Sequence, residues 1–129
     1  MKVSFLVFFA FVASTSCFGQ KTTVYKLLQG KWQSMDDKTD LLWFDKNHQK
    51  GISAGINKWD DELFVLSNSC ENSSDKDRGL PKEKDKYISA TDSDMCWYIV
   101  ELTPTRLVLS YMGRGNTLSY RRVTNKKAR

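Results

Sequence analysis

Residues 96–111 read Cys96-Trp97-Tyr98-Ile99-Val100-Glu101-Leu102-Thr103-Pro104-Thr105-Arg106-Leu107-Val108-Leu109-Ser110-Tyr111. Two runs rich in aromatic and branched residues flank Thr-Pro-Thr, a pattern typical of two antiparallel strands joined by a tight turn. A second turn, Gly113-Arg114-Gly115-Asn116, precedes a third such run at 117–123. Two successive hairpins favour an up-and-down order of antiparallel strands.

Working towards the N-terminus, the same alternation of short strand patterns and turn residues continues. It predicts strands at 31–35, 40–44, 50–56, 62–66 and 86–90, which makes eight with the three C-terminal ones. A short helical turn capped by Thr22 or Thr23 is predicted before Gly30. Eight antiparallel strands close into a barrel that holds side chains or one small ligand. The predicted fold is therefore an all-β, eight-stranded antiparallel up-and-down barrel with a short N-terminal helix.

The N-terminus has the pattern of an export signal over residues 1–19. A basic start, Met1-Lys2, precedes an apolar run of nine residues from Phe5 to Ala13 and then small residues as far as Gly19. This run is shorter than the roughly 20 residues that a membrane-spanning helix needs. We expect an exported protein, periplasmic or secreted, without a transmembrane segment. The alternative is a lipoprotein anchored at Cys17.

Residues 20–129 then form one expected domain, predicted to be a monomer. Its 110 residues of the total 129 are too few for a (β/α)₈ enzyme or a two-domain dehydrogenase. The net charge of +5 resides mainly in five basic residues between Arg121 and Arg129. A nucleic-acid binder gathers its basic residues on one folded face, so this short basic tail argues against that function.

Cys70 and Cys96 remain as a pair once the signal is removed, and an oxidising compartment favours a disulfide between them. A metal or redox pair is the alternative. Zinc sites take four ligands, however, and His48 is the chain's single histidine. We therefore predict a structural disulfide, with no metal and no cofactor.

The segment 71–86 holds five acidic and five basic residues and has Leu80 as its one large apolar residue. Such a composition predicts a solvated loop anchored at Cys70. Within it, Asn72-Ser73-Ser74 matches the acceptor sequence for N-glycosylation, which matters in a eukaryotic secretory host.

Gly30-Lys31-Trp32 and the run 117–123 resemble the two ends of a lipocalin-type domain. In that family the first strand opens with Gly-x-Trp after a short helical turn, and a basic residue of the last strand covers the tryptophan and closes one barrel end. The resemblance implies that Gly30 and Trp32 open the first strand and that Arg122 covers Trp32 and closes the barrel end, with Arg121 as the alternative to Arg122. The plan is similar to that of small lipocalin-like proteins exported by Gram-negative bacteria.

Alternate residues of a barrel strand point inward, so several aromatic residues are candidates to line a cavity. We expect binding of a small hydrophobic or amphipathic ligand by Phe64, Trp97, Ile99, Leu109, Tyr111 and Tyr120. The alternative is a protein-binding module of the cell envelope, an inhibitor or immunity protein, that uses loop 71–86 and Arg114. Strands with two apolar faces, such as 41–44 and 63–66, imply that the N-terminal helix or a partner covers the barrel exterior.

An enzyme is not expected. Gly51-Ile52-Ser53-Ala54-Gly55 matches the Gly-x-Ser-x-Gly pattern of hydrolases, but no helical pattern follows it and His48 precedes it. We interpret it as a strand bent at glycine, and His48 as an exposed turn residue. The acidic groups 36–40 and 60–62 are interpreted as turn residues.

Overall fold

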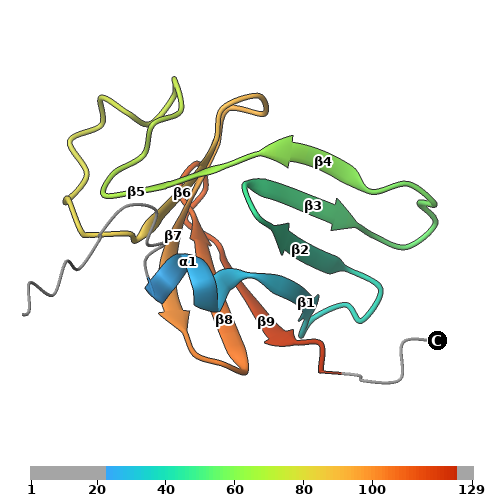
Figure 1. Cartoon of the computed structure of the whole chain (residues 1–129). Helices are drawn as coiled ribbons and strands as arrows, with labels where there is room; N and C mark the ends of the chain where they lie inside the picture. Colours follow the sequence, from blue (N-terminus) through green and yellow to red (C-terminus); the bar gives the residue numbers. More distant parts are fainter. Residues whose placement is uncertain (1–22, 125–129) are drawn as a thin grey trace, which may run out of the picture.

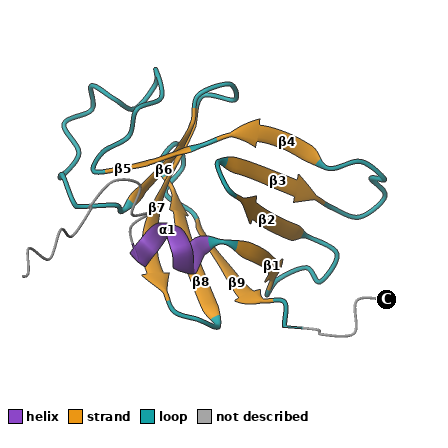
Figure 2. Ribbon diagram, in the orientation of Figure 1, coloured by secondary structure: helices purple, strands orange, loops and turns teal. Residues whose placement is uncertain are grey.

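The computed structural model describes residues 23–124 as one antiparallel sheet of nine strands with a short helix beside it (Figure 1, Figure 2). The predicted signal peptide at 1–19, Cys17 and the end of the basic tail lie outside the described residues. The elements are α1 (Thr23–Leu28), β1 (Gly30–Ser34), β2 (Leu41–Asp45), β3 (His48–Ile52), β4 (Asp60–Leu63), β5 (Val65–Ser67), β6 (Tyr87–Ala90), β7 (Met95–Leu102), β8 (Arg106–Tyr111) and β9 (Thr117–Arg122).

The order of strands across the sheet is β4-β3-β2-β1-β9-β8-β7-β6-β5, and every neighbouring pair is antiparallel. Pairing of β1 with β9 joins the first strand to the last, with Trp32 opposite Arg122. The two edge strands, β4 and β5, follow each other directly in the chain, so the sheet curls into a nearly closed barrel (Figure 1). The predicted all-β antiparallel barrel is confirmed.

The ninth strand arises because the predicted strand 62–66 is broken at Phe64. Before the break, β4 pairs with β3, with Leu63 opposite His48; after it, β5 pairs with β6, with Val65 opposite Ser89. Phe64 is buried at the break, and its backbone N–H donates to the Asn47 carbonyl at 2.8 Å. This change of partner leaves a seam in the barrel between β4 and β6.

Side chains bridge the seam. The β6–β7 turn reaches β4 through Ser93, whose backbone N–H and hydroxyl both donate to the Glu62 carboxylate, at 3.2 and 3.0 Å. Glu62 is thus fixed at the place where the strand ladder is interrupted.

Helix α1 and Arg122 close one end of the barrel. Trp32 is fully buried, and its indole Nε1–H donates to the Leu28 carbonyl at the end of α1, at 2.9 Å. The guanidinium of Arg122 lies over the Trp32 ring, with its carbon 4.2 Å from the ring centroid. Arg121, the next residue, is exposed.

The outer face of β6 and β7 is covered by the loop that joins β5 to β6. The predicted disulfide is confirmed: Cys70 of the loop bonds to Cys96 of β7. Both cysteines are buried with Tyr87, and Leu80 of the loop packs against them. This covering segment is part of the chain itself.

The loop is less solvated than its composition predicts, because two of its polar residues are buried and paired. Asn72 is fully buried and donates from Nδ2 to Asp75 at 2.7 Å and to the Asp94 carbonyl at 3.1 Å. Asp75 in turn accepts from Arg78 at 2.8 Å. Polar contacts therefore replace the apolar ones that the loop lacks, and they bury the asparagine of the glycosylation motif.

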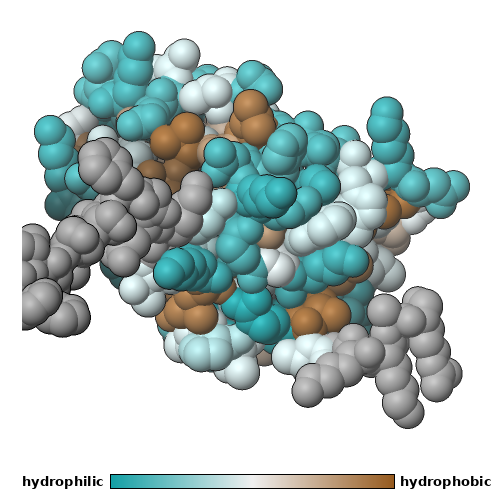
Figure 3. All heavy atoms as spheres, in the orientation of Figure 1, coloured by the Kyte–Doolittle hydropathy of each residue, from teal (hydrophilic) through white to brown (hydrophobic). Residues whose placement is uncertain are grey.

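The exterior of β2 carries a small aromatic and basic cluster. The Trp43 and Trp59 rings meet edge to face with centroids 5.7 Å apart, and the Lys50 ammonium lies 4.2 Å from the Trp43 ring. Hydrophilic residues predominate on the face seen in Figure 3, where apolar residues form small separate areas. Residues 23–124 contain no helix with the length and apolar character needed to span a membrane.

Candidate functional site

A cavity of about 240 Å³ lies inside the barrel, towards the end opposite Arg122. We call it the barrel cavity. It is bounded by residues of β2, β3, β7, β8 and β9 and of the turn before β9, namely Leu42, Gln49, Met95, Trp97, Leu109, Tyr111, Asn116, Leu118 and Tyr120. Its walls come mainly from alternate, inward-pointing positions along these strands, so the barrel itself fixes their arrangement.

Four of the six predicted ligand contacts line the barrel cavity: Trp97, Leu109, Tyr111 and Tyr120. Phe64 and Ile99 are not among its lining residues. The Phe64 ring packs edge to face on Phe44, with centroids 5.3 Å apart, at the break between β4 and β5. Ile99 is 1% exposed and lies further along β7, in the closed part of the core.

Tyr120 lines this cavity, and its hydroxyl is neutral. Burial, and to a smaller extent the negative charges of Asp40 and Asp36, raise the pKa of Tyr120 to about 12. The phenol is therefore protonated throughout the physiological range and can donate a hydrogen bond. The neighbouring rings of Trp97 and Tyr111 have centroids 6.0 Å apart and form an aromatic wall.

Gln49 is the polar residue that sequence reasoning missed. It is 8% exposed, and its side-chain oxygen is buried without a hydrogen-bond partner among the described residues. An unsatisfied buried acceptor costs about 1–3 kcal/mol. Gln49 lies opposite Phe44 of β2, whose side chain points inward, so the register of the β2–β3 hairpin turns the carboxamide into the barrel.

A second, more open cavity of about 480 Å³ lies at the seam. We call it the acidic groove. It shares Gln49 and Met95 with the barrel cavity, and its other lining residues are Asp60, Asp61, Glu62, Asp92 and Ser93. Four of these seven residues are acidic and none is basic.

The acidic residues 60–62 are not turn residues, as the sequence suggested, but belong to β4. They stand beside Asp92 because the β6–β7 turn crosses the seam to meet Glu62. The Asp61 carboxylate lies 2.8 Å from Nδ1 of His48, and Lys50 of β3 is its partner across the strand pair. Within residues 23–124, no three His, Cys, Asp or Glu side chains are grouped so as to hold a metal ion.

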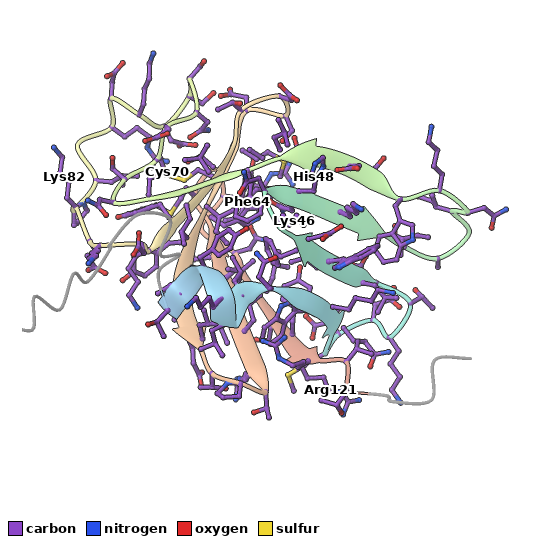
Figure 4. All side chains as sticks on the ribbon, in the orientation of Figure 1. Lys46, His48, Phe64, Cys70, Lys82 and Arg121 are labelled. Carbon is purple, nitrogen blue, oxygen red and sulfur yellow. A yellow bond between two sulfur atoms is a disulfide. The ribbon has the colours of Figure 1, made fainter. Side chains whose placement is uncertain are left out.

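The remaining sequence candidates lie elsewhere. His48 begins β3 with a half-exposed side chain, rather than standing in a turn (Figure 4). Ser53 follows β3 in a turn closed by a hydrogen bond from Ile56, and no helix follows it in the described chain. Arg114 is exposed in the turn between β8 and β9.

Comparisons with family models, curated proteins and solved structures found no match for this chain.

Proposed function

We propose that the chain is a lipocalin-like binding protein that takes a small amphipathic ligand into the barrel cavity. The observation that carries the proposal is an aromatic and aliphatic cavity lined by Gln49, whose side-chain oxygen is buried without a hydrogen-bond partner. Apolar walls with a few placed polar groups are typical of small-molecule sites. The up-and-down strand order and the stacking of Arg122 on Trp32 support the lipocalin-like assignment.

The volume limits the ligand. Pockets for drug-sized molecules enclose about 300–1,000 Å³. The barrel cavity, at about 240 Å³, suits a smaller group, or one end of a molecule whose other end lies in the acidic groove.

Native mass spectrometry of the protein purified from its own host tests this function. An adduct that is lost on denaturation identifies the ligand. Leu118→Trp places a larger ring in the cavity and should abolish the adduct, whereas Val100→Trp, at an exposed position of β7, should keep it. An adduct retained equally by both variants would place the ligand outside the barrel cavity.

Protein binding through loop 71–86 is a second candidate, favoured by the way this loop is held. The disulfide and the buried Asn72–Asp75 pair keep its exposed charges in fixed positions, which lowers the entropy lost on binding. Deleting the loop would uncover Tyr87 and Cys96, so charge reversal is the better test. Lys82→Glu with Lys84→Glu changes two exposed residues and should abolish capture of a partner if this function holds.

A further inference from the structure

We propose that the ligand is an organic cation: an apolar group that fills the barrel cavity, joined to a protonated amine that lies in the acidic groove. This inference rests on the proposed function and specifies its ligand class. The two cavities share Gln49 and Met95 as lining residues and are therefore adjacent. The proposal places the apolar end of one molecule on one side of these two side chains and its charged end on the other.

The sign of the charge follows from the groove. Its lining contains the carboxylates of Asp60, Asp61, Glu62 and Asp92 and no basic side chain. Asp61 is paired with His48 and Glu62 is bonded to Ser93, but Asp60 and Asp92 form no ion pair within the described chain. Like-charged carboxylates around one groove repel each other, and a bound cation relieves that repulsion.

Gln49 supplies an independent argument for the same chemistry. Its buried oxygen has no donor, and the residue lines both cavities at their shared wall. An alkylammonium group carries three N–H donors and no acceptor, so it can donate to the Gln49 oxygen once that side chain turns towards the groove, and to the carboxylates at the same time. A carboxylate ligand would bring only acceptors to a site already composed of acceptors.

Isothermal titration at pH 7 with n-hexylamine, n-hexanol and n-hexanoate tests the sign, because the three probes share one alkyl chain. We expect n-hexylamine to bind at least ~10-fold more tightly than either of the others, from its attraction to the carboxylates. Equal or tighter binding of n-hexanol or n-hexanoate would overturn the cation inference and leave the proposed function standing. Binding of none of the three would overturn both.

Two exposed acids give the matched variants. Asp60→Asn with Asp92→Asn should weaken the binding of n-hexylamine by ~10-fold or more and leave the affinity for n-hexanol unchanged. The control, Glu71→Gln with Asp77→Asn, removes the same charge from exposed positions of the β5–β6 loop and should leave both affinities unchanged. Equal weakening by both pairs would mean a general effect of net charge, against a groove-specific site.

Gln49→Met separates a ligand contact from a purely structural role. Removing the unpaired acceptor should raise the stability of the protein towards urea. It should also weaken the binding of n-hexylamine more than the binding of n-hexanol. An unchanged amine affinity would overturn the role of Gln49. Calcium chloride, added as a competitor, should not displace n-hexylamine at equal concentration; displacement would identify the groove as a site for inorganic cations and overturn the proposal.

Discussion

The Nη1 group of Arg122 donates a hydrogen bond of 2.7 Å to the backbone carbonyl of Gln29, 93 positions earlier in the chain. The same guanidinium donates from Nε to the Pro104 carbonyl at 2.6 Å and from Nη2 to the Leu27 carbonyl. One side chain of the last strand therefore connects the end of α1, the β7–β8 turn and β9. Burial lowers the pKa of Arg122, which still remains charged.

Replacing Arg122 by lysine should lower the free energy of unfolding by about 2 kcal/mol, because an ammonium cannot reach three separate carbonyls in the planar geometry of a guanidinium. Urea denaturation measures this change. Arg121→Lys is the matched control: Arg121 is adjacent and exposed, and its replacement should change stability by less than ~0.5 kcal/mol. Equal losses in the two variants would contradict a bracing role specific to Arg122.

Gly30→Ala should destabilise the barrel more than Gly55→Ala. Both glycines have positive φ, at 116° and 78°, so each substitution carries backbone strain of about 1–3 kcal/mol. A Cβ at Gly30 would also lie 2.7 Å from Nη1 of Arg122, and the hydrogen bonds of this guanidinium to backbone carbonyls hold it in place. A Cβ at Gly55 would meet no atom within 4 Å. Urea midpoints of the two variants compare the costs. Equal midpoints would show that the Arg122 side chain moves aside without loss of stability.

The barrel class was predictable because it rests on local patterns: strands of β-forming residues with turn residues between them. The break at Phe64 was not predictable, because the residues on both sides have strand character. What changes there is the partner strand, from β3 to β6, and that choice is made by the closure of the whole barrel. The same closure brings Asp92 to Asp60, which are 32 positions apart.

The inward position of Gln49 could not be predicted from the sequence for a related reason. It lies in the polar run Asn47-His48-Gln49-Lys50, which predicted a turn before a strand starting at Lys50. The strand in fact begins at His48, and its register with β2 makes Gln49 the inward residue. The aromatic residues of the cavity were recognisable from strand alternation alone, since hydrophobic side chains mark the inward face.

Loss of the Ser74 hydroxyl should raise the pKa of Asp94. Hydrogen bonds from the side chain and the backbone of Ser74 hold the pKa of the Asp94 carboxyl below its ordinary value of 3.8. A folded pKa below the unfolded one stabilises the native state above pH 3.8, and this contribution disappears as the pH falls through the folded pKa. As the pH is lowered, residues 72–78 should therefore lose their protection from hydrogen exchange at a lower pH in the wild type than in Ser74→Ala.

The pKa itself is measured by carboxyl NMR titration of the wild type and of Ser74→Ala. Ser73→Ala is the control, because it retains the backbone N–H of residue 73 and the hydroxyl of Ser74. An Asp94 pKa that is the same in all three proteins would show that the Ser74 hydrogen bonds do not hold the loop to the β6–β7 turn.

Tyr120 should make the barrel sensitive to alkaline pH. Its folded pKa of about 12 exceeds the ordinary value of 10.0, so the unfolded chain loses the phenolic proton first. The native state is then stabilised fully below pH 10, and the contribution decreases as the pH rises towards 12, by about 2–3 kcal/mol over the full window. Tyr120→Phe should show a smaller decrease in urea stability between pH 9 and pH 11.5 than the wild type. Asp40→Asn removes one of the charges that raise this pKa. It should therefore make the decrease in stability smaller, but only in part, since burial is the larger cause. Identical pH profiles for the wild type and Tyr120→Phe would place the Tyr120 hydroxyl in water and contradict its burial.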